Sequence, residues 1–249
     1  MPSTLDSTSD SALNPVQSTV TVQALLGLRR PPIAIGFFDS PPAGLPVWSG
    51  PPVAAGCVFW SKAQEGHRFY TVPADHYNCA VGAHTHGIAL PVERATELEQ
   101  TVGFMVENKY LALSEVPGIP TLSGPPGVVA YGPVDSAGFA PDVVVIAATP
   151  AQAMLIYEAA VQIGASDAVM NLLGRPGCAI LPLVASGKTA AISLGCKGNR
   201  TFTGLPDNEM YLAIAGDRWE SLVRQLLQVL SANQTLGNYY SERKQTFAG

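Results

Sequence analysis

The stretch that most constrains the fold lies at residues 141–163, which read PDVVVIAATPAQAMLIYEAAVQI. Residues 143–148 are almost continuously apolar, which is typical of a strand buried on both faces. Thr149 and Pro150 follow, and this pair predicts the cap and the first position of a helix that runs to about Ile163. Because Thr149, Pro150 and Gln152 interrupt the apolar run, the sequence favours a buried strand followed by a helix over a membrane span.

The rest of the chain alternates between helical and strand patterns, with no linker that would divide it. This alternation predicts an α/β or α+β fold, a single domain with a mixed β-sheet flanked by helices. We expect the domain to span residues 15–236, between a disordered N-terminal arm at 1–14 and a C-terminal tail at 237–249. Helices are predicted at 15–28, 57–64, 93–109, 149–163 and 218–232, and strands at 31–39, 68–72, 127–134, 141–148, 188–195 and 210–216.

Composition narrows the classes of function. Hydrophobic residues make up 47% of the 249-residue chain and charged residues only 13%, which favours extensive buried or subunit-covered surface and hence a homo-oligomer. A net charge of −5 with scattered Lys and Arg argues against binding to nucleic acid or to an anionic membrane. The polar, acidic start lacks a targeting pattern, so a cytoplasmic location is expected. There, four cysteines are more typical of free thiols or metal ligands than of disulfides.

All four cysteines fall into two similar units, which suggests an internal two-fold pseudo-repeat. In each unit a Gly-Cys pair leads into a short, mostly apolar segment, and a glycine follows nine residues after the cysteine. A strand-like run comes next, and then a second cysteine with a glycine close behind it. The first unit contains Gly56, Cys57, Gly66, Cys79 and Gly82, and the second contains Gly177, Cys178, Gly187, Cys196 and Gly198.

The positions of the four thiols predict their chemistry. Cys57 opens the predicted helix at 57–64, and Cys178 opens a further candidate helix. At both places the helix dipole favours a thiolate, the form that binds metal or attacks a substrate. Cys79 and Cys196 are expected in glycine-flanked loops, where the backbone can approach a bulky ligand. Four converging thiolates suit a [4Fe–4S] cluster or a structural zinc ion. Without a C-x-x-C spacing, they are equally consistent with small buried hydrophobic residues.

The four histidines of the chain lie within 67–86, close to Cys79. The spacing Cys79-x4-His84-x-His86 suits zinc, copper or haem iron. On a strand, His84 and His86 would share one face. Ordinary polar loop residues are the alternative interpretation.

Three cations are candidate cofactor-binding residues. The segment GCKGNR at 195–200 resembles an anion-binding turn in which Lys197 and Arg200 lie near backbone amides, although a plain surface turn explains it equally well. Arg175 precedes Cys178 by three residues. It is expected either to lower the pKa of the Cys178 thiol or simply to cover the surface.

Several stretches together resemble the DUF169 family, a widespread and largely uncharacterised prokaryotic group. They are LLGLRRPPIAIGFF, NCAVGAHTHG, YGPVDSAGFAPDVVVIAATPAQAMLI, GRPGCA and SLGCKGNR followed by DNEMYLAI, and the resemblance spans about residues 20–235. It implies a shared site made by Cys57, Cys79, Cys178 and Cys196, with an arginine at Arg200. His84 and His86 depart from the commoner pattern of small residues after the second cysteine, so they are candidate ligands particular to a subfamily. The resemblance supplies no activity.

These observations predict a cytoplasmic metal-centre protein. Its cofactor would be an iron–sulfur cluster, [4Fe–4S] in type, held by the four cysteines. Its role would be electron transfer or the oxidation or reduction of a small molecule, which would make it an oxidoreductase in the second case. Its partners would be that molecule or a redox protein. The alternatives are a protein that binds haem, zinc or another metal through His84 or His86, and a metal-free enzyme with a cysteine thiolate.

Overall fold

The computed structural model describes residues 22–164, 171–173 and 175–247. Their centre is a seven-stranded sheet in which every neighbouring pair is antiparallel except β5 and β6. The predicted single mixed sheet flanked by helices is therefore confirmed. The strands, in the spatial order β2-β3-β1-β4-β7-β6-β5, are β1 (Ile33–Phe38), β2 (Phe69–Thr71), β3 (Val128–Pro133), β4 (Val143–Ala148), β5 (Asn171–Leu173), β6 (Ala190–Ser193) and β7 (Met210–Ala215).

The central strand β4 is buried along its whole length, as its sequence predicts. Its side chains alternate between two hydrophobic cores, with Val143, Val145 and Ala147 on one face and Val144, Ile146 and Ala148 on the other. Since successive side chains of a strand point to opposite faces, a continuously apolar strand needs a covering layer on both sides.

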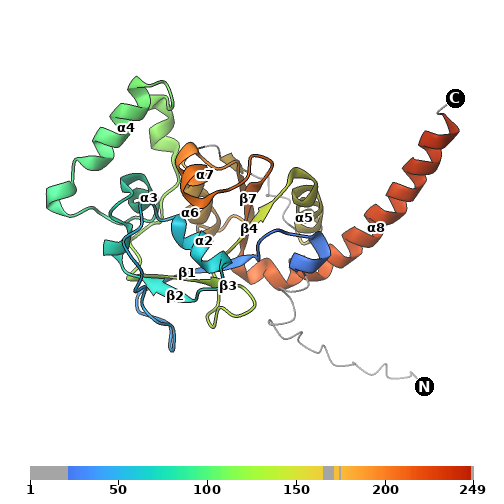
Figure 1. The fold of residues 1–249 in the computed structure, drawn as a ribbon, viewed down its shortest axis with the longest axis horizontal. Coiled ribbons are helices and arrows are strands. Elements are labelled where there is room, and N and C mark those ends of the chain that lie inside the picture. The colour runs from blue at the N-terminus through green and yellow to red at the C-terminus, as the bar shows by residue number, and fades with distance from the viewer. Residues whose placement is uncertain (1–21, 165–170, 174, 248–249) are drawn as a thin grey trace, which may run out of the picture.

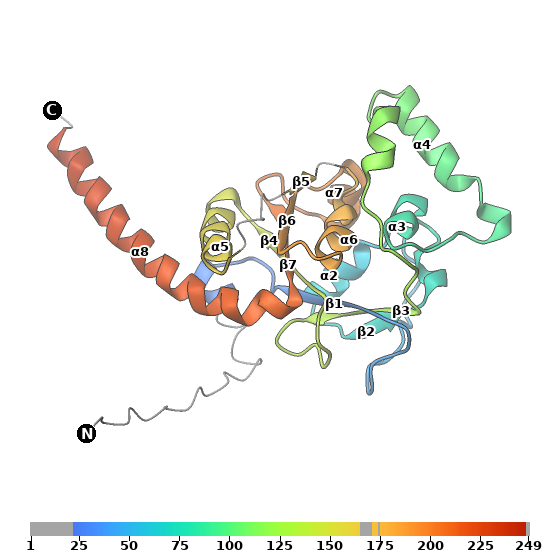
Figure 2. The same cartoon turned by 180° about the vertical axis from the view of Figure 1, so that it is seen from behind.

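Helices form those two layers, as Figures 1 and 2 show. One face carries α2 (Val58–Gln64) and α6 (Ile180–Ala185), with α3 (Ala80–Thr85), α4 (Glu97–Glu107) and α7 (Lys197–Thr203) on the same side. The other carries α5 (Pro150–Gln162), α8 (Trp219–Thr246) and a helical segment at 22–26. Thr149 caps α5, and its hydroxyl accepts the backbone N–H of Gln152 as predicted. Short 3₁₀ turns lie at η1 (Pro73–His76), η2 (Val92–Arg94), η3 (Leu113–Gly118), η5 (Gly177–Ala179) and η6 (Gly216–Arg218).

The sheet order reflects an internal two-fold repeat. The unit β1-α2-β2-β3 corresponds to β4-α6-β6-β7, so the order β2-β3-β1-β4-β7-β6 reads the same from both ends. The helix of each unit packs in the same way, α2 on β3 and β1, and α6 on β7 and β4. Strands β1 and β4 pair antiparallel at the centre. A pseudo-two-fold axis normal to the sheet therefore passes between them.

The two repeat helices also end in the same way. Gly66 follows α2 at φ +97° and Gly187 follows α6 at φ +103°, a backbone region that L-residues with side chains rarely adopt. The N–H groups of Gly66 and His67 donate to Ala63 and Lys62, and those of Gly187 and Lys188 donate to Val184 and Leu183. This is the Schellman pattern at both ends, and it explains the glycine nine residues after each first cysteine.

Some boundaries differ from the predictions. The predicted helix at 15–28 begins outside the described residues, as does the predicted N-terminal arm. The predicted helix at 93–109 is divided into η2 and α4, and α3, α7 and β5 were not predicted. Helix α8 continues to Thr246, through the segment expected to be a tail. Among the described residues, no helix is long and apolar enough to cross a membrane.

Candidate functional site

The four cysteines occupy equivalent places in the two repeats. Cys57 is the residue before α2, and Cys178 lies in η5, directly before α6. Cys79 caps α3 and Cys196 caps α7: each Sγ accepts a backbone N–H three residues later, at 3.3 Å. Cys79 and Cys196 therefore lie at the ends of loops, as expected, and each of these loops leads directly into a short helix that was not predicted.

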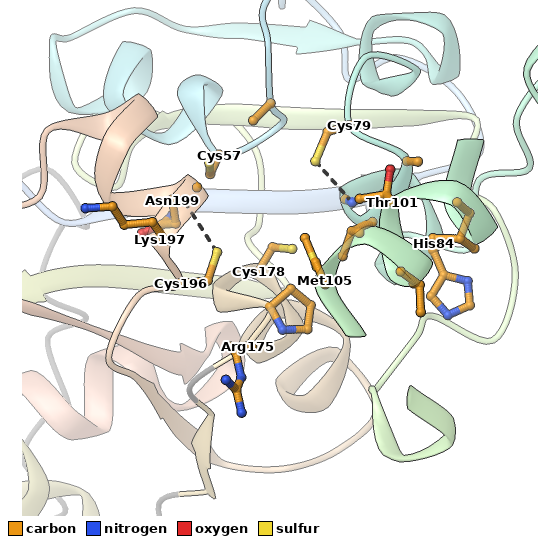
Figure 3. A pocket seen from close by; sticks show the side chains of 18 of the residues that line it. Cys57, Cys79, His84, Thr101, Met105, Arg175, Cys178, Cys196, Lys197 and Asn199 are labelled. Atoms are coloured by element: carbon orange, nitrogen blue, oxygen red, sulfur yellow. Dashed lines mark hydrogen bonds between the residues drawn. The ribbon is translucent and has the colours of Figure 1, made fainter. Parts of the chain in front are cut away.

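The repeats bring the four thiols together across the pseudo-axis. Helix α2 of the first repeat contacts α7 of the second, and α3 of the first contacts η5 of the second. All four cysteines line one cavity, and Figure 3 shows their side chains around a common space. None forms a disulfide. The fold therefore allows a single site that contains all four cysteines, which is the arrangement expected from the sequence.

Burial holds the thiols of Cys57, Cys79 and Cys178 in their neutral form. It raises the pKa of Cys57 to about 12, with a further rise caused by Cys79 and a smaller one by Cys196. The pKa of Cys79 is also raised, mainly by burial, and that of Cys178 lies well above its usual range for the same reason. The expectation of a lowered pKa at Cys178 is therefore wrong, because loss of water around the sulfur raises it. Arg175 is exposed, which agrees with the alternative expectation that it covers the surface.

Every pair among the four cysteines interacts electrostatically, because charge on one raises the pKa of another. Like charges within a few ångströms disfavour ionisation of each other. Four thiolates at this place therefore require a compensating positive centre.

Hydrogen-bond donors nevertheless surround the sulfurs. Two backbone N–H groups donate to Cys79 and Cys196, and the Thr85 hydroxyl lies 3.4 Å from the Sγ of Cys178. That hydroxyl has one proton and also lies 2.8 Å from the Gly82 carbonyl, so it serves one acceptor at a time. The Asn199 amide lies close enough to lower the pKa of Cys57, although its geometry falls short of a hydrogen bond. Such donors stabilise sulfur that carries negative charge.

The spacing of the site does not match a single metal ion. Among the described residues, no three His, Cys, Asp or Glu side chains form a group that could hold one ion. Ligand bonds of about 2.3 Å from one zinc ion would bring tetrahedral sulfurs to about 3.8 Å from each other. A cluster spaces its thiolates more widely, because each binds a different metal atom.

The cavity is much larger than the part that the thiols line. Its volume is about 710 Å³. Most of its wall is apolar and comes from α3, α4, η3 and α7, and no Asp or Glu side chain is among the described residues that line it. A cavity of this size and apolar character is typical of a small-molecule site.

His84 and His86 both line this cavity, in different ways. His84 lies in α3 and His86 directly after it, so they do not share the face of a strand. Figure 3 shows His84 on the outer side of α3, away from the four sulfurs. His86 is buried, and burial lowers the pKa of its imidazole. Its Nδ1 lies 2.8 Å from the Gly82 carbonyl. A carbonyl only accepts, so Nδ1 carries the proton and leaves a lone pair on Nε2, which has no partner among the described residues.

His76 is a buried residue of this region that the sequence did not single out. Its ring lies 5.2 Å from that of His86, centroid to centroid, and its Nδ1 lies against Gly56, next to Cys57. Its Nε2 is 2.8 Å from the Thr71 hydroxyl, which also reaches the Val129 carbonyl. Burial, and then His86, lower the pKa of His76 well below its usual value, so both imidazoles are neutral.

The three predicted cations have separate places. Arg175 and Lys197 line the cavity, but Arg200 is not among the described lining residues. The Arg200 guanidinium donates to the carbonyls of Pro206, Leu194 and Glu209 at 2.7, 2.6 and 2.9 Å. Arg200 therefore fixes the backbone around α7, and it does not lie in the cavity wall where a contact with a cofactor was expected.

Tyr110 connects the other two cations to the segment after α4. Arg175 donates to its carbonyl oxygen, stacks over its ring at 5.1 Å and pairs with Glu115 at 3.1 Å. The Lys197 backbone N–H donates to its hydroxyl at 2.9 Å. Both residues thus hold the cavity wall in place.

Asn199 is the most informative lining residue that sequence reasoning missed. Its side chain is buried beside Cys57, yet neither its Nδ2 nor its Oδ1 has a hydrogen-bond partner among the described residues. A buried amide without partners is costly, which suggests that something else pairs with it. Its place in GCKGNR, between Gly198 and Arg200, was the available signal.

Comparison with known proteins gives one match. The model of the family DUF169, described as uncharacterised ArCR, matches residues 21–225. No curated protein and no solved structure matches the chain. Because the match covers most of the chain, this protein belongs to the DUF169 family.

Proposed function

We propose that Cys57, Cys79, Cys178 and Cys196 hold an iron–sulfur cluster, and that the protein transfers electrons to or from a small molecule or a redox protein. When bound, such a cluster supplies one-electron transfer. The protein's own residues would hold it, shield it from water and direct hydrogen bonds to its sulfurs.

One observation carries this proposal: the four thiols lie around one space, charge on neighbouring thiols raises the pKa of Cys57, Cys79 and Cys178, and a donor lies near each sulfur. A neutral thiol sulfur is only a weak acceptor, so donors directed at it stabilise a metal-free site weakly. Thiolates bound to a positively charged metal core gain more, and hydrogen bonds to cluster sulfurs tune the reduction potential.

The same observation disfavours a metal-free thiol enzyme. A nucleophilic cysteine needs a lowered pKa, but the pKa values of Cys57, Cys79 and Cys178 are all raised.

The test is anaerobic purification with measurement of iron, acid-labile sulfide and the visible spectrum. We expect iron and sulfide in equal amounts and a broad absorption in the blue that bleaches on reduction. Cys57→Ser and Cys178→Ser should each lose most of the iron. Ile156→Val is the matched control, because Ile156 is buried on the other face of the sheet. It should cost about 0.5–1.5 kcal/mol of stability and keep the iron.

Other outcomes would count against the cluster. A colourless protein with stoichiometric zinc would assign the thiols to a structural ion, and a sharp Soret band would assign the site to haem. Equal iron content in wild type and both serine variants would remove the cysteines from the metal site altogether.

A further inference from the structure

Helix α4 turns its apolar side toward the cavity and not toward the protein core. Leu98, Val102 and Met105 line the cavity at helical spacing i, i+4 and i+7. No residue of α4 is fully buried, and in Figures 1 and 2 the helix stands off from the layered body. Burial of an apolar face is what normally stabilises a helix of this length, so the face needs an apolar occupant of the cavity.

The part of the cavity wall that α4 forms is nevertheless tied to the rest of the protein. Tyr110, three residues after α4, receives bonds from Arg175 and from the backbone of Lys197. Glu115 in η3 pairs with the same Arg175. The apolar wall is therefore a fixed part of the cavity.

We infer that this cavity binds a flat aromatic molecule that carries no positive charge, as the small-molecule reactant beside the four thiols. The role of this molecule as a redox reactant rests on the proposed function. Binding of the molecule itself depends only on the cavity.

The lining gives the chemistry of this ligand. Phe104, Tyr110 and Phe202 supply aromatic faces, and Met105 supplies a thioether that packs well against rings. With no carboxylate among the described lining residues, a cation would enter without a counter-ion, whereas Lys197 at the rim suits an anion. Figure 3 shows the Lys197 side chain directed away from the sulfurs, so the charged end of such a ligand would lie outward.

A second observation marks the inner end as a ligand site. Asn199 presents a buried donor and a buried acceptor, both without partners among the described residues, in the cavity wall beside Cys57. A carbonyl or hydroxyl on the inner edge of the ring would satisfy the donor.

The test uses three probes of known charge and shape with the full-length protein in calorimetric titrations at pH 7. They are 1-naphthoate, 1-naphthylmethylammonium and cyclohexanecarboxylate. We expect one 1-naphthoate per chain, bound at least about tenfold more tightly than either other probe, a difference of about 1.4 kcal/mol. Equal binding of the two naphthyl probes, or tighter binding of the cation, would overturn the inference.

Two variants of α4 locate the binding site. Val102→Glu places a carboxylate in the lining and should weaken 1-naphthoate by at least about tenfold. Gln100→Glu adds the same charge on the exposed side of α4 and should change the affinity by less than about twofold. Circular dichroism confirms that both fold. Equal affinities for the two variants would place the probe elsewhere.

The same titration with Cys57→Ser separates this inference from the proposed function. If the variant lacks iron but binds 1-naphthoate like wild type, the cavity assignment holds whether or not a cluster exists. If wild type contains the cluster and no probe binds, the cluster proposal stands and the ligand inference fails.

A different observation concerns the C-terminal half of α8. This helix has 28 residues, a length of about 42 Å, and Figures 1 and 2 show it extending well past the body. From Ser231 to Phe247 every residue except Asn233 is exposed. Leu236 is 49% exposed, Tyr240 62% and Phe247 73%.

These exposed residues continue a row of side chains along α8, here called the seam, whose first part packs against the rest of the protein. Leu222, Leu226 and Val229 are buried against α5 and the sheet. Alternating steps of three and four residues lead on to Asn233, Leu236, Tyr240, Arg243 and Phe247. This strict heptad is the pattern of a coiled coil, and an isolated half-helix of this length is marginal in water.

We propose that the segment 231–247 packs against the same segment of a second copy of the chain. The occupant is a second copy because Leu236, Tyr240 and Phe247 of this seam can pack against the same residues of another chain, as a symmetric dimer requires, and because the seam is continuous with the packed α5–α8 interface.

Sedimentation of the full-length protein at several concentrations tests this. We expect a dimer that dissociates on dilution, and a monomer for the double variant Leu236→Glu with Tyr240→Glu. Gln234→Glu with Ser241→Glu is the matched control, because both residues are exposed one position beyond the seam. A monomeric wild type, or equal dissociation of the two double variants, would overturn the proposal.

Discussion

Cys57 shows, at the scale of a single residue, how burial outweighs helix position. It precedes α2, where the dipole favours a thiolate, yet its pKa rises to about 12 because water is excluded from the sulfur. Cys178 behaves in the same way in the second repeat. Cys57 and Cys178 are therefore poor nucleophiles in the folded chain.

Alkylation of metal-free protein measures this directly. At pH 8, iodoacetamide should modify Cys57 and Cys178 at least about tenfold more slowly than a free cysteine of pKa about 8.5, because the thiolate is the reacting form. The rate should rise with pH, and the urea-unfolded protein should react like free cysteine. Fast labelling of the folded protein below pH 8 would restore the thiol-enzyme alternative.

His76 predicts how stability depends on pH. Burial lowers its pKa well below 6.5, so the unfolded chain takes up a proton below that pH and the folded chain does not. The free energy of unfolding should therefore be unaffected by His76 above about pH 6.5 and fall by up to about 1.4 kcal/mol per pH unit below it.

Urea denaturation between pH 5 and 7.5 checks this slope. His76→Gln should reduce the slope and leave the part that His86 contributes, whereas His67→Gln, whose side chain is largely exposed, should leave the slope unchanged. Equal slopes for wild type and His76→Gln would show that His76 takes up its proton in the folded protein.

At the scale of the element, the ends of α2 and α6 are where the two repeats agree most closely. Each helix ends at a glycine with positive φ and a Schellman pair of hydrogen bonds. The end of the helix fixes where the following strand begins, and with it the path toward the second cysteine of the repeat.

Matched substitutions test that equivalence. Gly66→Ala and Gly187→Ala should each lower the free energy of unfolding by about 1–2 kcal/mol, because a side chain disfavours this backbone region. Gly118→Ala, at a glycine with open space around it and no positive φ, should have little effect. A large cost at only one of the two positions would contradict the equivalence.

At the scale of the whole molecule, the site joins the two halves of the sheet. Two thiols come from residues 57–79 and two from 178–196. Contacts between α2 and α7 and between α3 and η5 hold these two parts of the chain together. A group bound there crosslinks both repeats, so its binding free energy becomes part of the folding free energy.

If the four cysteines hold the proposed metal centre, its anaerobic removal should therefore lower the melting temperature. A loss of about 2 kcal/mol corresponds to a fall of roughly 4–8 °C for a chain of this size. Chelator should not lower the melting temperature of Cys178→Ser further. An unchanged melting temperature on metal loss would mean that the four thiols do not join the halves through a bound group.

Several features were predictable because the residues that encode them are close together in the chain. Strand β4 and the Thr149-Pro150 start of α5 follow from local patterns of apolar and capping residues. The two Gly-Cys units predicted the four candidate ligands, because a Schellman glycine at a fixed distance from each cysteine is itself a local signal. The resemblance to DUF169 rested on the same stretches.

Tertiary structure decided what depends on residues far apart. Whether a thiol is ionised depends on the surrounding water, so packing of both repeats, not helix position, set the direction of the pKa values of Cys57 and Cys178. Asn199 and His76 entered the site because α7 and η1 were folded back beside Cys57. The pattern of the chain by itself determined which residues could be ligands, whereas the crossing of the two repeats decided that they share one cavity, because only long-range packing brings residues 57–79 against 178–196.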